Sequence, residues 1–174
     1  ELLVHVGFED INKFYHLLTV HFGPCNNQFF SSQYGIVWYS IVFVLLSDFT
    51  RYGLHYLLHH NRFLAPLHQM HHSAEVLTPF TLYRSHPFEM LLSYLRFVLV
   101  YAFVTGGFLY LHNDYYDFPK ILGISFFVVI SNVLGANLRH SNIPIGFGWL
   151  ERILISPKQH QMHHSVDLPM QNSN

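Results

Sequence analysis

Long apolar stretches alternate with polar ones along this chain, and their lengths predict helices that cross a membrane. The apolar stretches cover about residues 35–58, 88–111 and 118–138. A helix rises about 1.5 Å per residue, so roughly 20 apolar residues cross the ~30 Å hydrocarbon core of a bilayer. We therefore predict three membrane-spanning helices.

The remaining segments are polar or amphipathic. Residues 1–22 place charged side chains among apolar ones at helical spacing, which predicts an amphipathic helix lying on a membrane or on the protein itself. Residues 23–34 contain Gly, Pro, Asn and Ser and predict a loop. The chain begins without Met and stops in a polar stretch. We therefore expect a single domain over residues 1–174 that is truncated at one or both ends.

Counting the crossings places two histidine-rich stretches, residues 55–86 and 139–164, on one side of the membrane. Six basic residues lie on or near that side: Arg51, Arg62, Arg84, Arg139, Arg152 and Lys158. The opposite loop, residues 112–117, has two Asp and no Lys or Arg. The positive-inside rule then predicts that the histidines lie on the cytoplasmic side of the membrane. We expect that membrane to be a bacterial inner membrane or the endoplasmic reticulum.

Composition supports a membrane protein and excludes several classes. Hydrophobic residues make up 51% of the chain and charged residues 11%, whereas soluble domains have about 25% charged residues. The net charge of -1 predicts no nucleic-acid partner. The lone Cys25 excludes a disulfide framework, a cysteine zinc site and an iron–sulfur cluster. Histidine stands out, because its 15 copies outnumber the 9 Lys and Arg, and neutral imidazole is the commonest metal ligand.

Most of these histidines fall into three clusters. His55 and His59 are four residues apart and share a helix face, whereas His60 points about 100° away. The other two clusters are near-identical pentads, His68-Gln-Met-His71-His72 and His160-Gln-Met-His163-His164. In each pentad we expect the first and fourth residues to share a helix face. We expect the two adjacent histidines to point in different directions. They would then bind two different metals, or one would bind a metal and the other would contact the ligands around it.

The number of imidazoles predicts two metal ions, because a structural zinc site needs only four ligands. The chain has no His-Glu-x-x-His motif, which argues against an intramembrane zinc protease. Heme would require single histidines near the middle of the membrane rather than pentads at its surface.

These clusters resemble the three histidine boxes of the fatty acid hydroxylase/sterol desaturase superfamily over roughly residues 36–170. The linking sequences are similar too: Asp48-Phe49, Arg84-Ser-His86-Pro-Phe-Glu89, Asn137-Leu-Arg-His140-Ser-Asn142, and Pro157 before the last box. The resemblance implies an all-α integral membrane bundle with a cytosolic, histidine-rich helical cap that holds two iron ions. It also implies O2-dependent hydroxylation or desaturation of a lipid, such as a sterol or fatty acyl chain.

The expected ligands are His55, His59, His68, His71, His72, His140, His160, His163 and His164, with His60 and His86 as further candidates. Electrons would come from an external cytochrome b5-like or ferredoxin-like donor. We expect no heme or flavin in the chain, and zinc can replace iron in a preparation. The alternatives are a non-catalytic relative that serves as a structural subunit of a larger membrane complex, and a di-heme or metal-transport protein.

The sequence leaves open the roles of five polar residues and of one arginine. Asp48, Glu75, Glu89, Asn137 and Asp167 are unranked candidates for orienting the histidine rings. Arg96 lies inside the second apolar stretch, where an ionisable group is either functional or extends its side chain to the membrane surface. We favour the second reading for Arg96.

Overall fold

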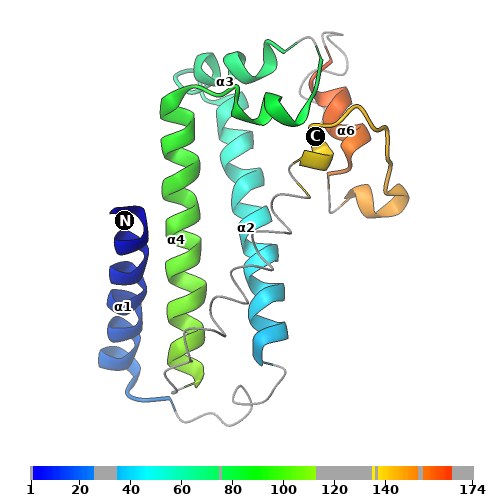
Figure 1. The fold of residues 1–174 in the computed structure, drawn as a ribbon. Helices are drawn as coiled ribbons and strands as arrows, with labels where there is room; N and C mark the ends of the chain where they lie inside the picture. The colour runs from blue at the N-terminus through cyan, green and yellow to red at the C-terminus, as the bar shows by residue number, and fades with distance from the viewer. Residues whose placement is uncertain are drawn as a thin grey trace. The chain divides into compact units, whose positions relative to one another are not determined.

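The computed structural model describes residues 2–25, 35–74, 76–112, 135, 137–152 and 155–165. Every regular element in these ranges is helical, which confirms the all-α prediction. In chain order they are α1 (Leu2–Phe22), α2 (Gly35–His60), α3 (Ala65–His72), the 3-10 helix η1 (Pro79–Tyr83), α4 (Pro87–His112), the 3-10 helix η2 (Gly148–Arg152) and α6 (Pro157–His163) (Figure 1).

The chain divides into two compact units. The first unit contains Glu1–Gly53 and Leu91–Val129, and the second contains Leu54–Met90 and Ile130–Asn174. Helices α2 and α4 each contribute residues to both units, because the divisions fall inside them.

Among the described residues, two helices are long and apolar enough to cross a membrane, as predicted for these two stretches. The candidate spans are Val37–His60 in α2 and Pro87–Leu111 in α4. Only 17% and 39% of their most apolar stretches are buried inside the protein. Their outward faces therefore suit contact with lipid better than contact with water. The third predicted helix, residues 118–138, lies almost wholly outside the described residues.

The core of the first unit forms where α2 and α4 pack together. It contains Tyr39 and Phe43 from α2 and Val100, Val104 and Phe108 from α4. The Tyr39 and Phe108 rings meet edge to face with centroids 5.0 Å apart. The Tyr39 hydroxyl lies 2.9 Å from Thr105 Oγ1, so the hydroxyl of this buried ring is satisfied across the helix pair.

Arg96 adds a polar connection to this helix pair. Its Nη1 donates hydrogen bonds to the Ser47 carbonyl oxygen and to Thr50 Oγ1, both at 3.0 Å. The expectation that Arg96 extends along its own helix to the membrane surface is therefore wrong. A cation in an apolar span is costly unless it finds partners, and α2 supplies them within reach.

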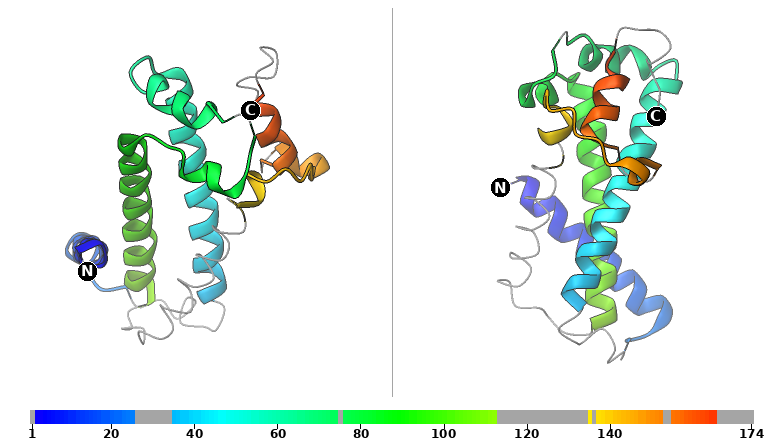
Figure 2. Two further views of the ribbon diagram at one scale, coloured as in Figure 1. Left: turned by 45° about the horizontal axis from the view of Figure 1, so that its top comes forward. Right: turned by 90° about the vertical axis from the view of Figure 1, so that its right-hand side faces the viewer.

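Helix α1 packs against α4 at Gly106 and crosses it obliquely (Figure 2). A Cβ atom on Gly106 would lie 3.0 Å from both the Ile11 carbonyl oxygen and Phe14 Cδ1. Glycine therefore permits this close approach, and the Phe14 and Phe103 rings pack beside it with centroids 5.0 Å apart. Of the two predicted positions for the amphipathic helix, the structure shows the one on the protein.

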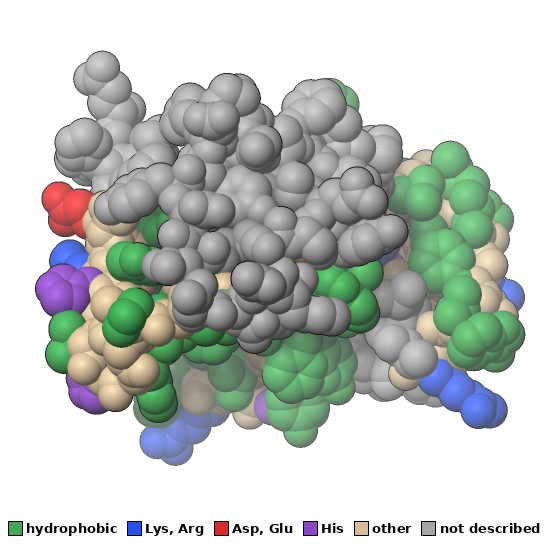
Figure 3. Space-filling model, turned by 90° about the horizontal axis from the view of Figure 1, so that it is seen from below, with side chains coloured by type: hydrophobic (Ala, Val, Ile, Leu, Met, Phe, Trp, Pro, Cys, Tyr) green, Lys and Arg blue, Asp and Glu red, His purple; other side chains and the backbone are tan. Residues whose placement is uncertain are grey.

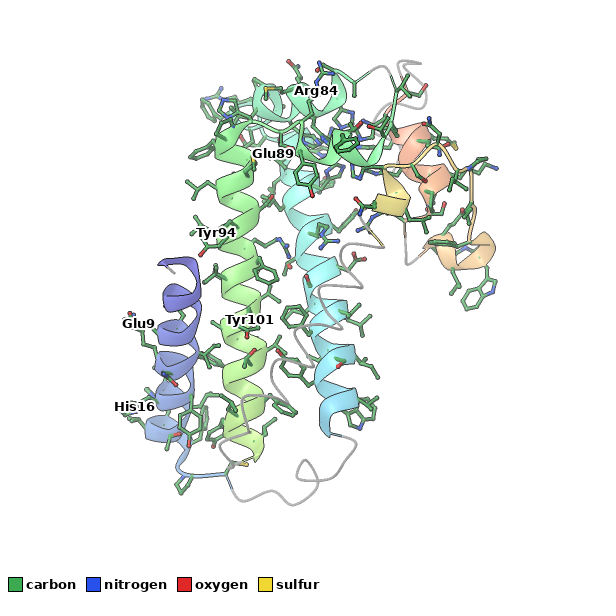
Figure 4. The ribbon with its side chains drawn as sticks, viewed as in Figure 1. Glu9, His16, Arg84, Glu89, Tyr94 and Tyr101 are labelled. Atoms are coloured by element: carbon green, nitrogen blue, oxygen red, sulfur yellow. The ribbon has the colours of Figure 1, made fainter. Side chains whose placement is uncertain are left out.

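The outward face of α1 carries charged side chains near the middle of the helix. Lys13 forms exposed ion pairs with Glu9 and Asp10, at 3.7 and 3.8 Å. Charged and histidine side chains gather at the edge where α1 lies (Figure 3), and Glu9 and His16 point away from α4 (Figure 4). Leu17 and Val20 are also exposed, so the outward face is mixed rather than wholly polar.

Candidate metal centre

The nine histidines expected to be ligands all lie in the second unit, where their ring nitrogens gather into two groups. We call these the five-histidine group and the four-histidine group. Within each group, one nitrogen from every ring lies within 4.8 Å of all the others. The five-histidine group is His55, His59, His68, His72 and His163, and the four-histidine group is His71, His140, His160 and His164.

The nitrogen–nitrogen distances suit a common metal ion. In the five-histidine group, His163 Nε2 lies 2.9 Å from the Nε2 atoms of both His55 and His59. Two nitrogens bound to one ion at about 2.1 Å and at a right angle are about 3.0 Å apart. One imidazole nitrogen carries at most one proton and cannot donate to two neighbours at once. A shared ion therefore explains this convergence better than hydrogen bonds between rings.

The four-histidine group shows the same spacing. His140 Nε2 lies 3.2 Å from His71 Nε2 and 3.1 Å from His160 Nε2. The two groups are neighbours, because the rings of His72 and His164 stack with centroids 4.2 Å apart. The second unit can therefore hold two ions side by side.

The two pentads exchange members between the groups. Helix α3 places His68 and His72 in the five-histidine group and His71 in the other. The pentad that begins in α6 places His160 and His164 in the four-histidine group and His163 in the other. The adjacent pairs diverge as expected, but the ligands that share a group are the first and fifth residues of each pentad. The first and fourth residues, which we expected on one helix face, do stack ring on ring in each pentad but enter different groups. The reason is that four residues overshoot a full turn by only ~40°, whereas three fall ~60° short.

The start of α6 is fixed immediately before its histidines. Ser156 is the N-cap, and its Oγ accepts a hydrogen bond from the Gln159 backbone N–H at 3.1 Å. Gln159 Oε1 in return accepts the Ser156 backbone N–H at 3.1 Å. Pro157 occupies the first turn, where its missing N–H costs nothing. The capping box therefore fixes where α6 begins, three residues before the second pentad starts at His160.

Burial keeps these rings in the form that binds metal. Burial, with smaller contributions from neighbouring histidines, lowers the pKa of His71 and of His163 to about 4. The pKa of His164 falls to about 2 for the same reasons. At neutral pH these imidazoles are therefore neutral, with a lone pair available for an ion.

Glu89 orients one of the rings. Its Oε1 lies 3.0 Å from His68 Nδ1, and both side chains are buried. A proton on Nδ1 that is donated to this carboxylate leaves His68 Nε2 free to face the five-histidine group. Glu89 lies in the first turn of α4 (Figure 4).

Of the other candidates for orienting rings, Asn137 lies in the second unit with the histidines and stays a prediction. Asp48 belongs to the first unit and lies 3.8 Å from Arg51. Glu75 and Asp167 lie outside the described residues. The sequence alone did not rank Glu89 above the other candidates for orienting a histidine ring. The feature that distinguishes it is its position in the first turn of α4.

The residues present fit a metal ion. Both ring nitrogens of His164 are buried, and neither has a hydrogen-bond partner in the part of the chain that the structure describes. Buried polar atoms are costly when unpaired, and an ion at the four-histidine group would satisfy one of these nitrogens. Sets made only of imidazoles suit zinc, copper, iron or nickel rather than magnesium or calcium.

The two further ligand candidates belong to neither group. The His60 ring stacks on Tyr56 at 3.9 Å, and its Nδ1 lies 2.9 Å from the Tyr56 carbonyl oxygen. His86 Nδ1 accepts a hydrogen bond from the Phe88 backbone N–H at 3.2 Å, at the start of α4. The structure therefore brings His59, and not His60, toward the other histidines.

Comparisons with known proteins agree with this arrangement. The Delta(7)-sterol 5(6)-desaturase ERG3B of Gibberella zeae is 27% identical over 135 residues, which cover 76% of this chain and 38% of that protein. The chain thus spans well under half the length of this relative. No solved structure matches the chain significantly. The sequence pattern of the fatty acid hydroxylase family matches residues 40–172, a segment that contains both histidine groups. The chain therefore belongs to the fatty acid hydroxylase family.

Proposed function

We propose that this chain is the metal-binding membrane domain of an O2-dependent di-iron oxidoreductase that hydroxylates or desaturates a lipid. The observation that carries the proposal is the pair of adjacent groups of five and four histidines. The two apolar helices long enough to cross a membrane support a substrate that arrives through the bilayer. The desaturase named above supports a sterol as one candidate substrate, and a fatty acyl chain is another.

In this proposal each histidine group holds one iron, and both units form one membrane-embedded domain over residues 1–174. Bound iron would supply the redox chemistry for O2-dependent oxidation of a C–H bond of the lipid. The protein's part is to keep the ligands neutral and correctly directed. The low pKa values of His71 and His163 keep them unprotonated at neutral pH. Glu89 holds His68 in one orientation.

The setting of the reaction follows from the charge pattern. We propose that the histidine groups face the cytoplasm, in a bacterial inner membrane or the endoplasmic reticulum, because the basic residues concentrate in the histidine-rich segments. Electrons come from an external cytochrome b5-like or ferredoxin-like protein, since nothing in the proposed chemistry of this chain supplies them. Other membrane subunits are compatible with this arrangement.

Metal analysis tests the proposal directly. The natural full-length protein, purified from membranes, should contain two irons per chain, in part replaced by zinc, and no heme absorbance. Lipid extracts of cells with and without the gene should differ in an oxygen-dependent product. A protein that folds without metal and changes no lipid would instead support a structural subunit.

The first histidine cluster offers a matched pair of variants. His59→Ala should lose iron and product, because His59 Nε2 lies 2.9 Å from His163 Nε2 inside the five-histidine group. His60→Ala should retain both, because the His60 ring stacks on Tyr56 outside the groups. Equal loss in the two variants would contradict the assignment.

A further inference from the structure

A short segment of the second unit exposes large apolar side chains next to α6. We call residues 143–152 the η2 loop. Trp149 is 74% exposed and Ile143 is 51% exposed, and Ile145 and Leu150 are also exposed. Hydrophobic side chains lie at the surface beside Lys and Arg side chains at the right-hand edge of Figure 3, where η2 lies. The metal groups make no use of this surface.

Hydrogen bonds hold the η2 loop against the start of α6. Glu151 Oε1 accepts the Phe147 backbone N–H at 3.0 Å and the Ser156 hydroxyl at 2.6 Å. The Lys158 backbone N–H donates to the Ile145 carbonyl oxygen at 3.1 Å. These bonds join Ile145 directly, and Phe147 through Glu151, to the residues that begin α6. The loop that carries the exposed apolar side chains is therefore held in place by hydrogen bonds.

The backbone of the loop also directs Trp149 outward. Gly148 has a φ of 59°, in the left-handed region that residues with a Cβ atom rarely adopt. Trp149 follows this turn directly and lies in η2. The exposed indole is therefore a consequence of the local backbone and of the hydrogen bonds to Glu151.

The composition of this surface fits the interface of a bilayer. Tryptophan is enriched at membrane interfaces, where its apolar ring and its N–H each find a suitable environment. The exposed Arg152 and Lys158 follow the apolar residues and complement anionic lipid headgroups. The acidic residue of the segment, Glu151, has one carboxylate oxygen engaged by Phe147 and Ser156.

A bilayer is also the apolar neighbour that this unit already has. Residues 54–60 of α2 and 87–90 of α4 belong to the second unit. One end of each candidate span lies within these residues, at His60 in α2 and at Pro87 in α4. The membrane surface must therefore lie close to the second unit. The observations above point to lipid, and none of them points to a separate protein partner.

We propose that the η2 loop inserts Trp149 and its aliphatic neighbours into the membrane interface and so attaches α6 to the bilayer surface. The proposal concerns a lipid contact of the second unit and does not depend on which metal is bound or whether the protein is catalytic. Its failure would leave the proposed function intact.

The chain has only two tryptophans, Trp38 and Trp149, which makes a fluorescence test specific. Trp38→Phe leaves Trp149 as the only tryptophan of residues 1–174, and any tryptophan that the natural protein has outside them is replaced by Phe as well. The protein is reconstituted into vesicles of phosphatidylcholine and phosphatidylglycerol, with part of the phosphatidylcholine brominated near either end of the acyl chain. Interfacial side chains lie ~5–10 Å into the headgroup boundary, so shallow bromines should quench Trp149 about twofold more than deep ones.

Trp149→Phe provides the matched control, because Trp38 is exposed on a candidate span. Its emission should be quenched by brominated lipid and protected from acrylamide. If Trp38→Phe fails to fold, the quenching of Trp149 follows by subtracting this control from the wild-type protein. Trp149 emission that is insensitive to brominated lipid and freely quenched by acrylamide would overturn the proposal, and the surface would then be assigned to water or to a protein partner.

Discussion

The two units of this protein are built around opposite kinds of core. The first unit buries Tyr39, Phe43 and aliphatic residues of α4, and the hydroxyl of Tyr39 finds its partner within the same unit. The buried side chains of the second unit include six histidines: His68, His71, His140, His160, His163 and His164. Its interior is therefore made largely of imidazoles whose nitrogens converge.

This difference separates what each unit needs in order to be stable. An apolar core is stabilised by removing its surface from water or by close packing in lipid. A core of imidazoles is desolvated without such a gain, and its nitrogens are satisfied only when something binds them. We infer that metal binding contributes to the stability of the second unit as well as to its chemistry.

The strongest contrast should come from removing one ligand of each group. His71→Ala and His163→Ala should each abolish nearly all product, because both ions are needed at once. The double variant should be no worse than either single variant, since residues that act as a unit are not additive. The measurement is oxygen-dependent product in membranes, with protein amount checked by immunoblot.

His16→Ala is the control for these two variants, because His16 is exposed on α1 in the first unit. It should retain iron and activity. Graded partial losses across the ligand variants, or an inactive but well-expressed His16→Ala protein, would count against one di-metal centre in the second unit.

Acid should destabilise the metal-free second unit more than the first. The folded pKa values of His71 and His163, about 4, lie below the ordinary value of 6.5. The unfolded chain therefore binds more protons than the folded chain between these values, and stability is lost as the pH falls from about 6.5 toward 4. Hydrogen exchange of chelator-treated protein in detergent should show α3 and α6 opening first, and simultaneous opening of both units would contradict the contrast.

Phe43→Ala should affect the first unit instead. Phe43 is 1% exposed, and truncation of a fully buried Phe costs about 3 kcal/mol. We expect a lower unfolding temperature in detergent, with iron per chain unchanged in the protein that remains folded. Phe49→Ala is the matched control, because Phe49 lies on the same helix and is 72% exposed. An equal loss of stability in the two variants would argue against the packed core.

Glu89→Gln should weaken metal binding without removing a ligand. The amide keeps the shape of the side chain but loses the charge that favours a proton on His68 Nδ1. Loss of such a partner lowers metal affinity about 10- to 100-fold. Competition with a chelator measures this affinity, and the absorption spectrum of the cobalt-loaded protein reports ligand geometry. An unchanged affinity and spectrum would show that Glu89 does not position His68.

Tyr39→Phe should have the smallest effect. It removes the hydrogen bond to Thr105 but leaves the aromatic core. Hydrogen bonds between membrane helices contribute about 0.6 kcal/mol on average. A small fall in unfolding temperature, with the histidine groups and their iron unaffected, is the expected result. Iron loss in this variant would mean that the two cores are coupled.

Much of this architecture was predictable from local sequence. The apolar stretches 35–58 and 88–111 became α2 and α4, because the thickness of a bilayer sets the length of a helix that crosses it. The spacing of the three histidine clusters marked eight of the nine histidines that the structure gathers, and the family resemblance of its linking sequence marked His140. Ring convergence was expected because repeated clusters of one ligand type on one side of the membrane have a single economical explanation.

Tertiary structure decided how these parts combine. It separated His59 from His60, placed α1 on α4, turned Arg96 toward α2 and selected Glu89 as the partner of His68. It also divided each pentad between the two groups, with the first and fifth residues together. Sequence spacing determines which side chains share a helix face, but which faces meet depends on packing between segments far apart in the chain. The Nε2 atoms of His55 and His163 lie 2.9 Å apart only because packing brings α2 and α6 together.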